Sequence, residues 1–139
     1  MKFWDSSAVV ALLVGEAGQK FAQRELEQDP AMVVWWGTRV ECVSALVRRE
    51  RDRSTDAPSS RAALAQLGKL GEQWHEVLPT TVLRSTAERI LRVHVLRAAD
   101  ALQLAAAITA AVDDPASLEF VSLDERLKDA AAREGFPVR

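Results

Sequence analysis

The sequence predicts an α/β fold in which helices cover a parallel sheet. Short runs of strand-forming residues alternate along the chain with longer helical segments, a pattern typical of parallel sheets. The length of 139 residues suits one packed core, so residues 1–139 are expected to form a single domain. Hydrophobic residues make up 48% of the chain and charged residues 27%, which disfavours a disordered tail, a collagen-like repeat or a coiled-coil rod.

The first half of the chain predicts two strands and four helices. Ser6 and Ser7 are suited to cap the first helix, and the GEAG segment at residues 15–18 ends it. The STDAP segment at residues 54–58 is the clearest loop. In order, we expect a strand over 2–4, helices over 6–14 and 21–28, a strand over 32–36, and helices over 37–53 and 59–74.

The second half predicts two further strands and three helices. The alanine-rich segment 98–112 is helical on propensity alone and ends at the DDP sequence of residues 113–115. Gly135 is suited to end the last helix in a left-handed conformation. In order, we expect a strand over 76–78, helices over 82–92 and 98–112, a strand over 120–123 and a helix over 124–133.

Composition also bears on compartment and partners. No apolar run approaches the roughly 20 residues that span a bilayer, so we expect neither secretion nor membrane insertion. The lone Cys42 has no intrachain disulfide partner, and Cys and His are too few for a zinc cage, which fits a reducing cytoplasm. A net charge of −2 disfavours coating of nucleic acid by bulk positive charge. The arginines clustered over 48–53 and 84–97 leave open a solvated helix face or a phosphate-binding surface.

Four acidic residues interrupt apolar segments at the end of a predicted strand or in the first turns of a helix: Asp5, Glu41, Asp100 and Asp124. In open α/β sheets the carboxyl ends of the strands share one edge, where ligands bind. The four carboxylates are therefore able to converge. Each also has a structural explanation, because Glu41 completes a capping box with Thr38 and the three aspartates suit helix N-termini.

Four carboxylates that converge need an explanation that one acid alone does not, because their negative charges repel one another. Carboxylates within about 5 Å of one another repel by roughly 3 kcal/mol per pair at an effective dielectric near 20, so such a cluster needs protons or a metal ion. Oxygen ligands suit Mg²⁺ and Mn²⁺. Such ions bind phosphodiesters and activate water, so phosphodiester hydrolysis is the chemistry that this set of residues predicts.

Around these acids the chain resembles the PIN-domain family, in particular the VapC toxins of bacterial toxin–antitoxin pairs. The matching segments follow the family order and span nearly the whole chain: DSSAVVAL at 5–12, TRVECVSAL at 38–46, LRAADALQLAAA at 96–107 and FVSLDERL at 120–127. The first and third segments are fairly specific together, and the second is weak alone. The resemblance implies a three-layer α/β/α sandwich around a short parallel sheet.

The resemblance also implies an activity, an endoribonuclease that uses Mg²⁺ or Mn²⁺ to hydrolyse RNA and is neutralised by a VapB-like antitoxin, and it implies a homodimer. Asp5, Glu41, Asp100 and Asp124 would be the catalytic, metal-binding acids. Ser6 and Ser122 match small polar positions that support the site. Arg97 lies one turn before Asp100, where it would hold a phosphate or pair with a carboxylate.

Other interpretations compete with this one. A receiver domain needs an acidic pair after the first strand, but Asp5 is followed by Ser6 and Ser7. A haloacid-dehalogenase-like phosphatase needs a second aspartate at the position of Ser7. The sequence therefore disfavours both. A PIN-like module that binds RNA or protein with little catalysis, and a housekeeping ribonuclease, remain open alternatives. Of the adjacent Trp35 and Trp36, we expect at least one in the core, and we expect His94 at a loop or helix end rather than as a general base.

Overall fold

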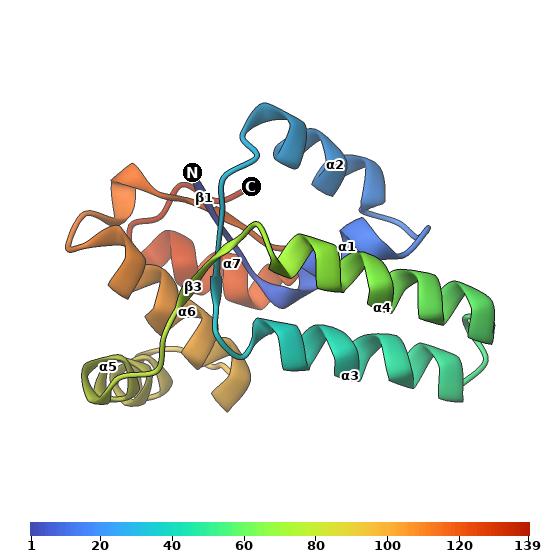
Figure 1. Ribbon diagram of the computed structural model, residues 1–139. Helices are drawn as coiled ribbons and strands as arrows, with labels where there is room; N and C mark the ends of the chain where they lie inside the picture. Colours follow the sequence, from blue (N-terminus) through green and yellow to red (C-terminus); the bar gives the residue numbers. More distant parts are fainter.

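The computed structural model describes residues 1–139 and contains one sheet of four parallel strands (Figure 1). The strands lie in the order β3–β2–β1–β4, and Phe3 in β1 stands opposite Val33 in β2 and Phe120 in β4. Their bounds are β1 Lys2–Trp4, β2 Met32–Trp35, β3 His75–Val77 and β4 Glu119–Val121. The predicted α/β fold with a short parallel sheet is confirmed.

Seven α-helices and one short 3-10 helix complete the fold. Helices α5, α6 and α7 lie on one side of the sheet, and α1, α3 and α4 lie on the other, with α3 and α4 side by side (Figure 1). The bounds are α1 Ser6–Leu13, α2 Gln19–Gln28, α3 Thr38–Arg51, α4 Ala57–Gly71, α5 Thr81–Val93, α6 Ala98–Ala111, η1 Pro115–Ser117 and α7 Glu125–Arg133. This arrangement is the expected three-layer sandwich.

Alternation along the short strands divides the core between the two faces of the sheet. Phe3 and Phe120 face α5, α6 and α7, and their rings stack with centroids 5.3 Å apart. Trp4 and Val121, the next residues along the same strands, face α1, α3 and α4. Since all four side chains are fully buried, the register that places Asp5 beside the end of β4 is fixed from both faces.

Several predicted boundaries were wrong by a few residues. Helix α4 begins at Ala57 within the predicted loop, because Asp56 accepts a hydrogen bond from the Ser59 amide and Pro58 fits the first turn. Strand β4 ends at Val121, before Ser122 turns toward the site. Of the predicted helices and strands, only β1 has the predicted bounds, and the others differ by one to three residues at one or both ends. Gly135 adopts the expected left-handed conformation, with φ +99°.

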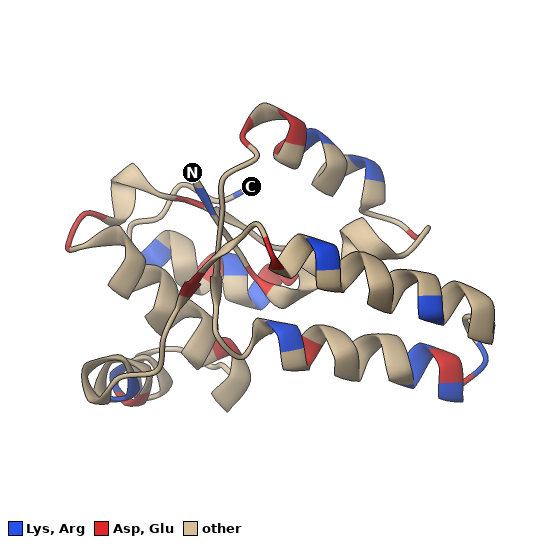
Figure 2. Cartoon of the chain, viewed as in Figure 1, with Lys and Arg blue, Asp and Glu red and all other residues tan.

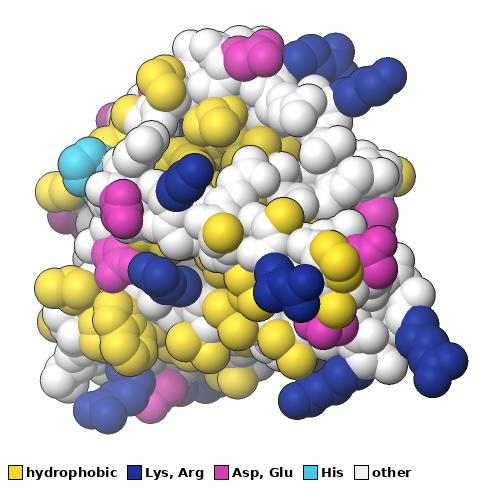
Figure 3. Space-filling model, turned by 45° about the vertical axis from the view of Figure 1, so that its right-hand side comes forward, with side chains coloured by type: hydrophobic (Ala, Val, Ile, Leu, Met, Phe, Trp, Pro, Cys, Tyr) yellow, Lys and Arg dark blue, Asp and Glu magenta, His cyan; other side chains and the backbone are white.

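The positions of charged residues are dispersed over the helices (Figure 2). In the space-filling view, basic residues are interspersed with apolar and uncharged atoms rather than gathered into one large patch (Figure 3). No helix of the structure is both long and apolar enough to cross a membrane.

Candidate active site

Asp5 lies directly after β1 and is almost completely buried, with 3% of its surface exposed. Three serine hydroxyls donate hydrogen bonds to its carboxylate: Ser122 to Oδ2 at 2.6 Å, Ser6 to Oδ1 at 3.3 Å, and Ser7 to Oδ2. Burial raises the pKa of Asp5, and these hydrogen bonds oppose that increase. The serines therefore stabilise the charged form of a carboxylate that is removed from water.

The expected cap at the start of α1 was wrong. Asp5 is the N-cap residue, although its side chain makes no capping bond, and Ser6 and Ser7 are the first two residues of the helix. Their hydroxyls donate to the Asp5 carboxylate and do not cap the free amides in the first turn of α1. The Ser7 oxygen also accepts a hydrogen bond of 2.9 Å from the Leu123 amide, which ties the end of β4 to α1.

Glu41 projects from the first turn of α3 toward the same region. The one proton of the Ser6 hydroxyl is shared between Asp5 and Glu41, with Glu41 Oε2 the nearer acceptor at 2.9 Å, and the Gln103 amide donates to Oε1 at 3.2 Å. The capping-box explanation was wrong, because Gly37 is the N-cap residue and Thr38 is already helical. Burial raises the pKa of Glu41, and the negative charges of Asp5 and Asp100 add to the increase.

Asp100 and Asp124 combine capping with a position at the site. Oδ2 of Asp100 accepts a hydrogen bond of 3.4 Å from the Arg97 amide at the start of α6, and Oδ1 of Asp124 accepts one of 3.0 Å from the Leu127 amide at the start of α7. Burial raises the pKa of Asp100, and the Asp124 carboxylate raises it further. Asp100 and Asp124 therefore stabilise the starts of their helices, as expected, and also lie close enough for their charges to interact.

All four acids line one surface hollow of about 350 Å³, which we call the acid hollow. Ser6, Ser7, Arg49 and Leu123 are among its other lining residues. The acids are arranged around it rather than packed into one cluster, and no three Asp, Glu, His or Cys side chains lie close enough together to hold one metal ion. The hollow thus concentrates negative charge without forming a closed ligand cage.

Three residues at the site were not among the sequence-predicted site residues. Gln103 is fully buried and also donates to Thr38 Oγ1 at 3.1 Å. Its signal was the lone amide in the apolar segment ALQLAAA of residues 101–107. Ser7 was assigned to capping alone. Arg49 belongs to the arginine cluster over 48–53, for which the sequence left open a solvated helix face or a phosphate-binding surface.

Four other residues weighed from the sequence lie outside the acid hollow. His94 follows α5, as expected, and its Nε2 lies 2.8 Å from Oε1 of Glu134. Trp35 is buried while Trp36 is 52% exposed, which confirms that at least one belongs to the core. Cys42 is buried, and burial raises the pKa of its thiol to about 12, so it is an inert apolar residue.

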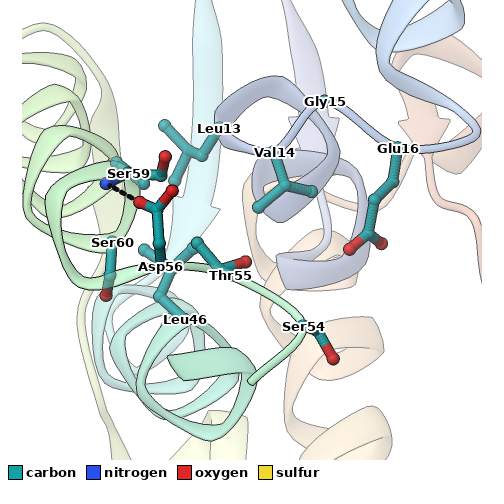
Figure 4. Close-up of a pocket in the computed structure, with 11 residues that line it drawn as sticks. Leu13, Val14, Gly15, Glu16, Leu46, Ser54, Thr55, Asp56, Ser59 and Ser60 are labelled. Atoms are coloured by element: carbon teal, nitrogen blue, oxygen red, sulfur yellow. Dashed lines mark hydrogen bonds between the residues drawn. The ribbon is translucent and has the colours of Figure 1, made fainter. Parts of the chain in front are cut away.

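A separate hollow of about 290 Å³ lies between the end of α1 and the start of α4 (Figure 4). It contains Asp56, whose carboxylate accepts the Ser59 amide hydrogen bond drawn in the figure. None of the four predicted acids lines this hollow. Its acidic residues are committed to structure, since Glu16 pairs with Arg49 at 3.2 Å.

Comparisons with known proteins agree with this arrangement. The family model described as PIN domain matches residues 2–133. The fold is also similar to the crystal structure of PAE2754 from Pyrobaculum aerophilum, with a TM-score of 0.65 and 19% sequence identity over 93% of this chain and 78% of that chain. No curated protein matches the sequence significantly. PIN domains are generally nucleases that use divalent metal ions. With nearly its whole length matched, the chain belongs to the PIN domain family.

Proposed function

We propose that the protein is a metal-dependent endoribonuclease whose active site is the acid hollow. The observation that carries the proposal is the meeting of Asp5, Glu41, Asp100 and Asp124 from four separate segments in one hollow. Burial and mutual repulsion disfavour ionised acids there, so their grouping is costly unless positive charge offsets it. A bound cation would offset this negative charge, and it would also attract the phosphate group of a substrate.

The donor chemistry fits Mg²⁺ or Mn²⁺. These ions prefer oxygen ligands, and Mg²⁺ is usually held by one or two carboxylates, with water and substrate phosphate completing its coordination. Asp5 and Glu41, joined through Ser6, and Asp100 with Asp124 would hold such ions. When bound, the metal would supply the positive charge that activates water and stabilises the transition state of phosphodiester hydrolysis.

The remaining chemistry belongs to the chain's own side chains. Ser6, Ser7 and Ser122 favour the ionised form of Asp5 and fix its orientation, and Gln103 does the same for Glu41. Because these donors are themselves tied to α1, β4 and α6, the carboxylates are ordered before substrate arrives. Preordered carboxylates avoid a reorganisation cost at the moment of reaction.

A toxin role is the finer part of the proposal. It rests on the VapC-like segments at residues 5–12 and 96–107, and it implies a VapB-like antitoxin, a homodimer and cytoplasmic action. An antitoxin that inserted a basic side chain into the acid hollow would pair with the carboxylates and exclude both cations and RNA. Expression of the chain alone would then arrest bacterial growth, and the arrest would require intact Asp100.

The nuclease proposal is tested with purified protein and a mixed-sequence single-stranded RNA. The expected result is cleavage with Mn²⁺ or Mg²⁺, loss of cleavage with excess chelator, and recovery when the ion is restored. Binding of RNA without cleavage under any of these conditions would favour the alternative of a binding module. Cleavage without growth arrest on expression would instead favour a housekeeping ribonuclease over a toxin.

A further inference from the structure

A second hollow adjoins the acid hollow and carries two arginines. It has a volume of about 660 Å³ and shares Asp100, Leu123 and Asp124 with the acid hollow. Arg97, the N-cap residue of α6, and Arg126, the second residue of α7, also line it. We call it the arginine hollow. The two cationic side chains come from different elements, so their convergence is a property of the fold and not of one helix face.

These two guanidinium groups are not committed to ion pairs. Arg49 pairs with Glu16, Arg89 with Glu134 and Arg139 with Glu119, whereas no carboxylate oxygen lies within 4.0 Å of a guanidinium nitrogen of Arg97 or Arg126. Both side chains are exposed. They therefore present unpaired donors at the border of a site rich in carboxylates.

Their distance from the acids is small enough for electrostatic coupling. The positive charges of Arg97 and Arg126 each lower the pKa of Asp100, which opposes the effect of Asp124. A planar guanidinium presents two parallel N–H groups that match phosphate oxygens, and unpaired arginines keep these donors free. The border of the acid hollow that carries the two arginines is thus suited to bind phosphate. The carboxylates themselves repel phosphate unless a cation is bound.

We propose that Arg97 and Arg126 bind the RNA phosphate next to the cleaved linkage, so that the backbone runs from the acid hollow into the arginine hollow. This inference rests on the proposed nuclease function and names the part of the substrate that these residues hold. The arginines position the backbone, and the reacting phosphate stays with the carboxylates. Their loss should weaken productive binding and leave the metal requirement unchanged.

The test uses a short RNA that the wild-type protein cuts at one linkage with Mn²⁺. In a series of otherwise identical RNAs, each uncut phosphodiester linkage in turn is replaced by a neutral methylphosphonate next to a 2′-O-methyl sugar. Matched control RNAs carry the 2′-O-methyl group at the same position and keep the charged phosphate. We expect one neighbouring linkage at which neutralisation lowers kcat/KM of the wild-type protein by about 10-fold, the loss typical of one charged hydrogen bond.

The variants are Arg97→Gln and Arg126→Gln, with Arg61→Gln and Arg92→Gln as controls. The controls remove the same charge from exposed, unpaired arginines that line neither hollow. On the unmodified RNA, kcat/KM of Arg97→Gln and of Arg126→Gln should each fall by about 10-fold. On the RNA with the sensitive linkage neutralised, kcat/KM of these two variants should fall little further. The slope of log kcat/KM against log salt should become shallower by about 0.7 per lost phosphate contact.

Two results would overturn the inference. If the hollow variants remain as sensitive to the neutral linkage as the wild type, the arginines serve the acids or the fold and do not bind phosphate. If the control variants lose the linkage sensitivity equally, the effect is one of net charge. Failure of the nuclease proposal is distinguishable from both, since the wild-type protein would then not cut the unmodified RNA with Mn²⁺.

Discussion

The hydroxyl of Ser122 donates a hydrogen bond of 2.6 Å to Oδ2 of Asp5, although 117 positions separate the two residues in the sequence. The contact exists because β1 and β4 are parallel neighbours, so the residues that follow them meet at one edge of the sheet. The same serine oxygen accepts a hydrogen bond of 3.0 Å from the Asp124 amide. Ser122 thus joins the first and last acids of the proposed active site.

Replacing Ser122 with alanine should weaken both the fold and the site. The buried Asp5 carboxylate would lose the hydrogen bond of 2.6 Å from Ser122, a change that costs about 1.5–3 kcal/mol of unfolding free energy. Because that bond lowers the pKa of Asp5, its loss would also raise the pKa and weaken Mn²⁺ binding. Urea unfolding and Mn²⁺ titration measure the two effects. Ser122→Thr, which retains a hydroxyl, should recover most of both, and equal losses in the two variants would contradict this role.

Asp124→Asn should separate helix capping from catalysis. Asparagine caps helices about as well as aspartate, so the bond from the Leu127 amide is retained and thermal stability should change little. Cleavage of RNA should fall by at least about 100-fold, because the negative charge at the acid hollow is lost. The matched control is Asp56→Asn, which alters the same capping bond at α4 outside the hollow and should leave cleavage intact. Equal activity of the two variants would remove Asp124 from the mechanism.

Gln103→Leu should shift the pH dependence of cleavage. The Gln103 amide lowers the pKa of Glu41, so its removal raises that pKa, and ionised Glu41 then requires a higher pH. The acidic limb of the kcat/KM profile should therefore move toward alkaline pH. Thr109→Val controls for a change in α6, because that hydroxyl donates only to the Ala105 carbonyl. A uniform fall in activity with an unmoved acidic limb would point to a purely structural role.

Asp100→Asn should change how stability depends on pH in the presence of chelator. The pKa of Asp100 is raised in the folded state, so the folded protein binds more protons than the unfolded chain between the two pKa values. Stability linked to this group is therefore lost as pH rises from about 3.9 through the raised value. Asparagine removes that loss. The stability of the variant relative to wild type, from urea unfolding at pH 4 to 7, should grow with pH, and a constant difference would contradict the assignment.

Most of the fold was predictable because the sequence carries strong local signals. The alternation of short apolar strands with helices predicted the parallel sheet, and the adjacent Phe3 and Trp4 occupy opposite faces, as a strand requires. Boundaries were less predictable where two local preferences compete. Ser6 and Ser7 suit a helix cap in sequence, but the carboxylate of Asp5 is a stronger acceptor for their hydroxyls than they are acceptors for amides.

From the sequence, the four acids and two of their hydrogen-bond donors, Ser6 and Ser122, were assigned to the candidate site, whereas the donors Ser7 and Gln103 were not. Asp5, Glu41, Asp100 and Asp124 stand out because each interrupts an apolar segment, and the structure places all four at one hollow. Their spacing around it, in place of a tight cluster, depends on tertiary hydrogen bonds such as the one from Gln103 to Glu41. Arg126 resembles any other exposed arginine until α6 and α7 are placed side by side.

The central claim is that the acid hollow is the active site of a metal-dependent ribonuclease, and RNA cleavage by Asp100→Asn tests it most directly. Wild-type and variant proteins, shown by circular dichroism to be equally folded, are compared on the same single-stranded RNA with and without Mn²⁺. We expect metal-dependent cleavage by the wild type and at least about a 100-fold loss in the variant, the size expected when a group that stabilises the transition state is removed. Cleavage at the wild-type rate by well-folded Asp100→Asn protein would contradict the central claim.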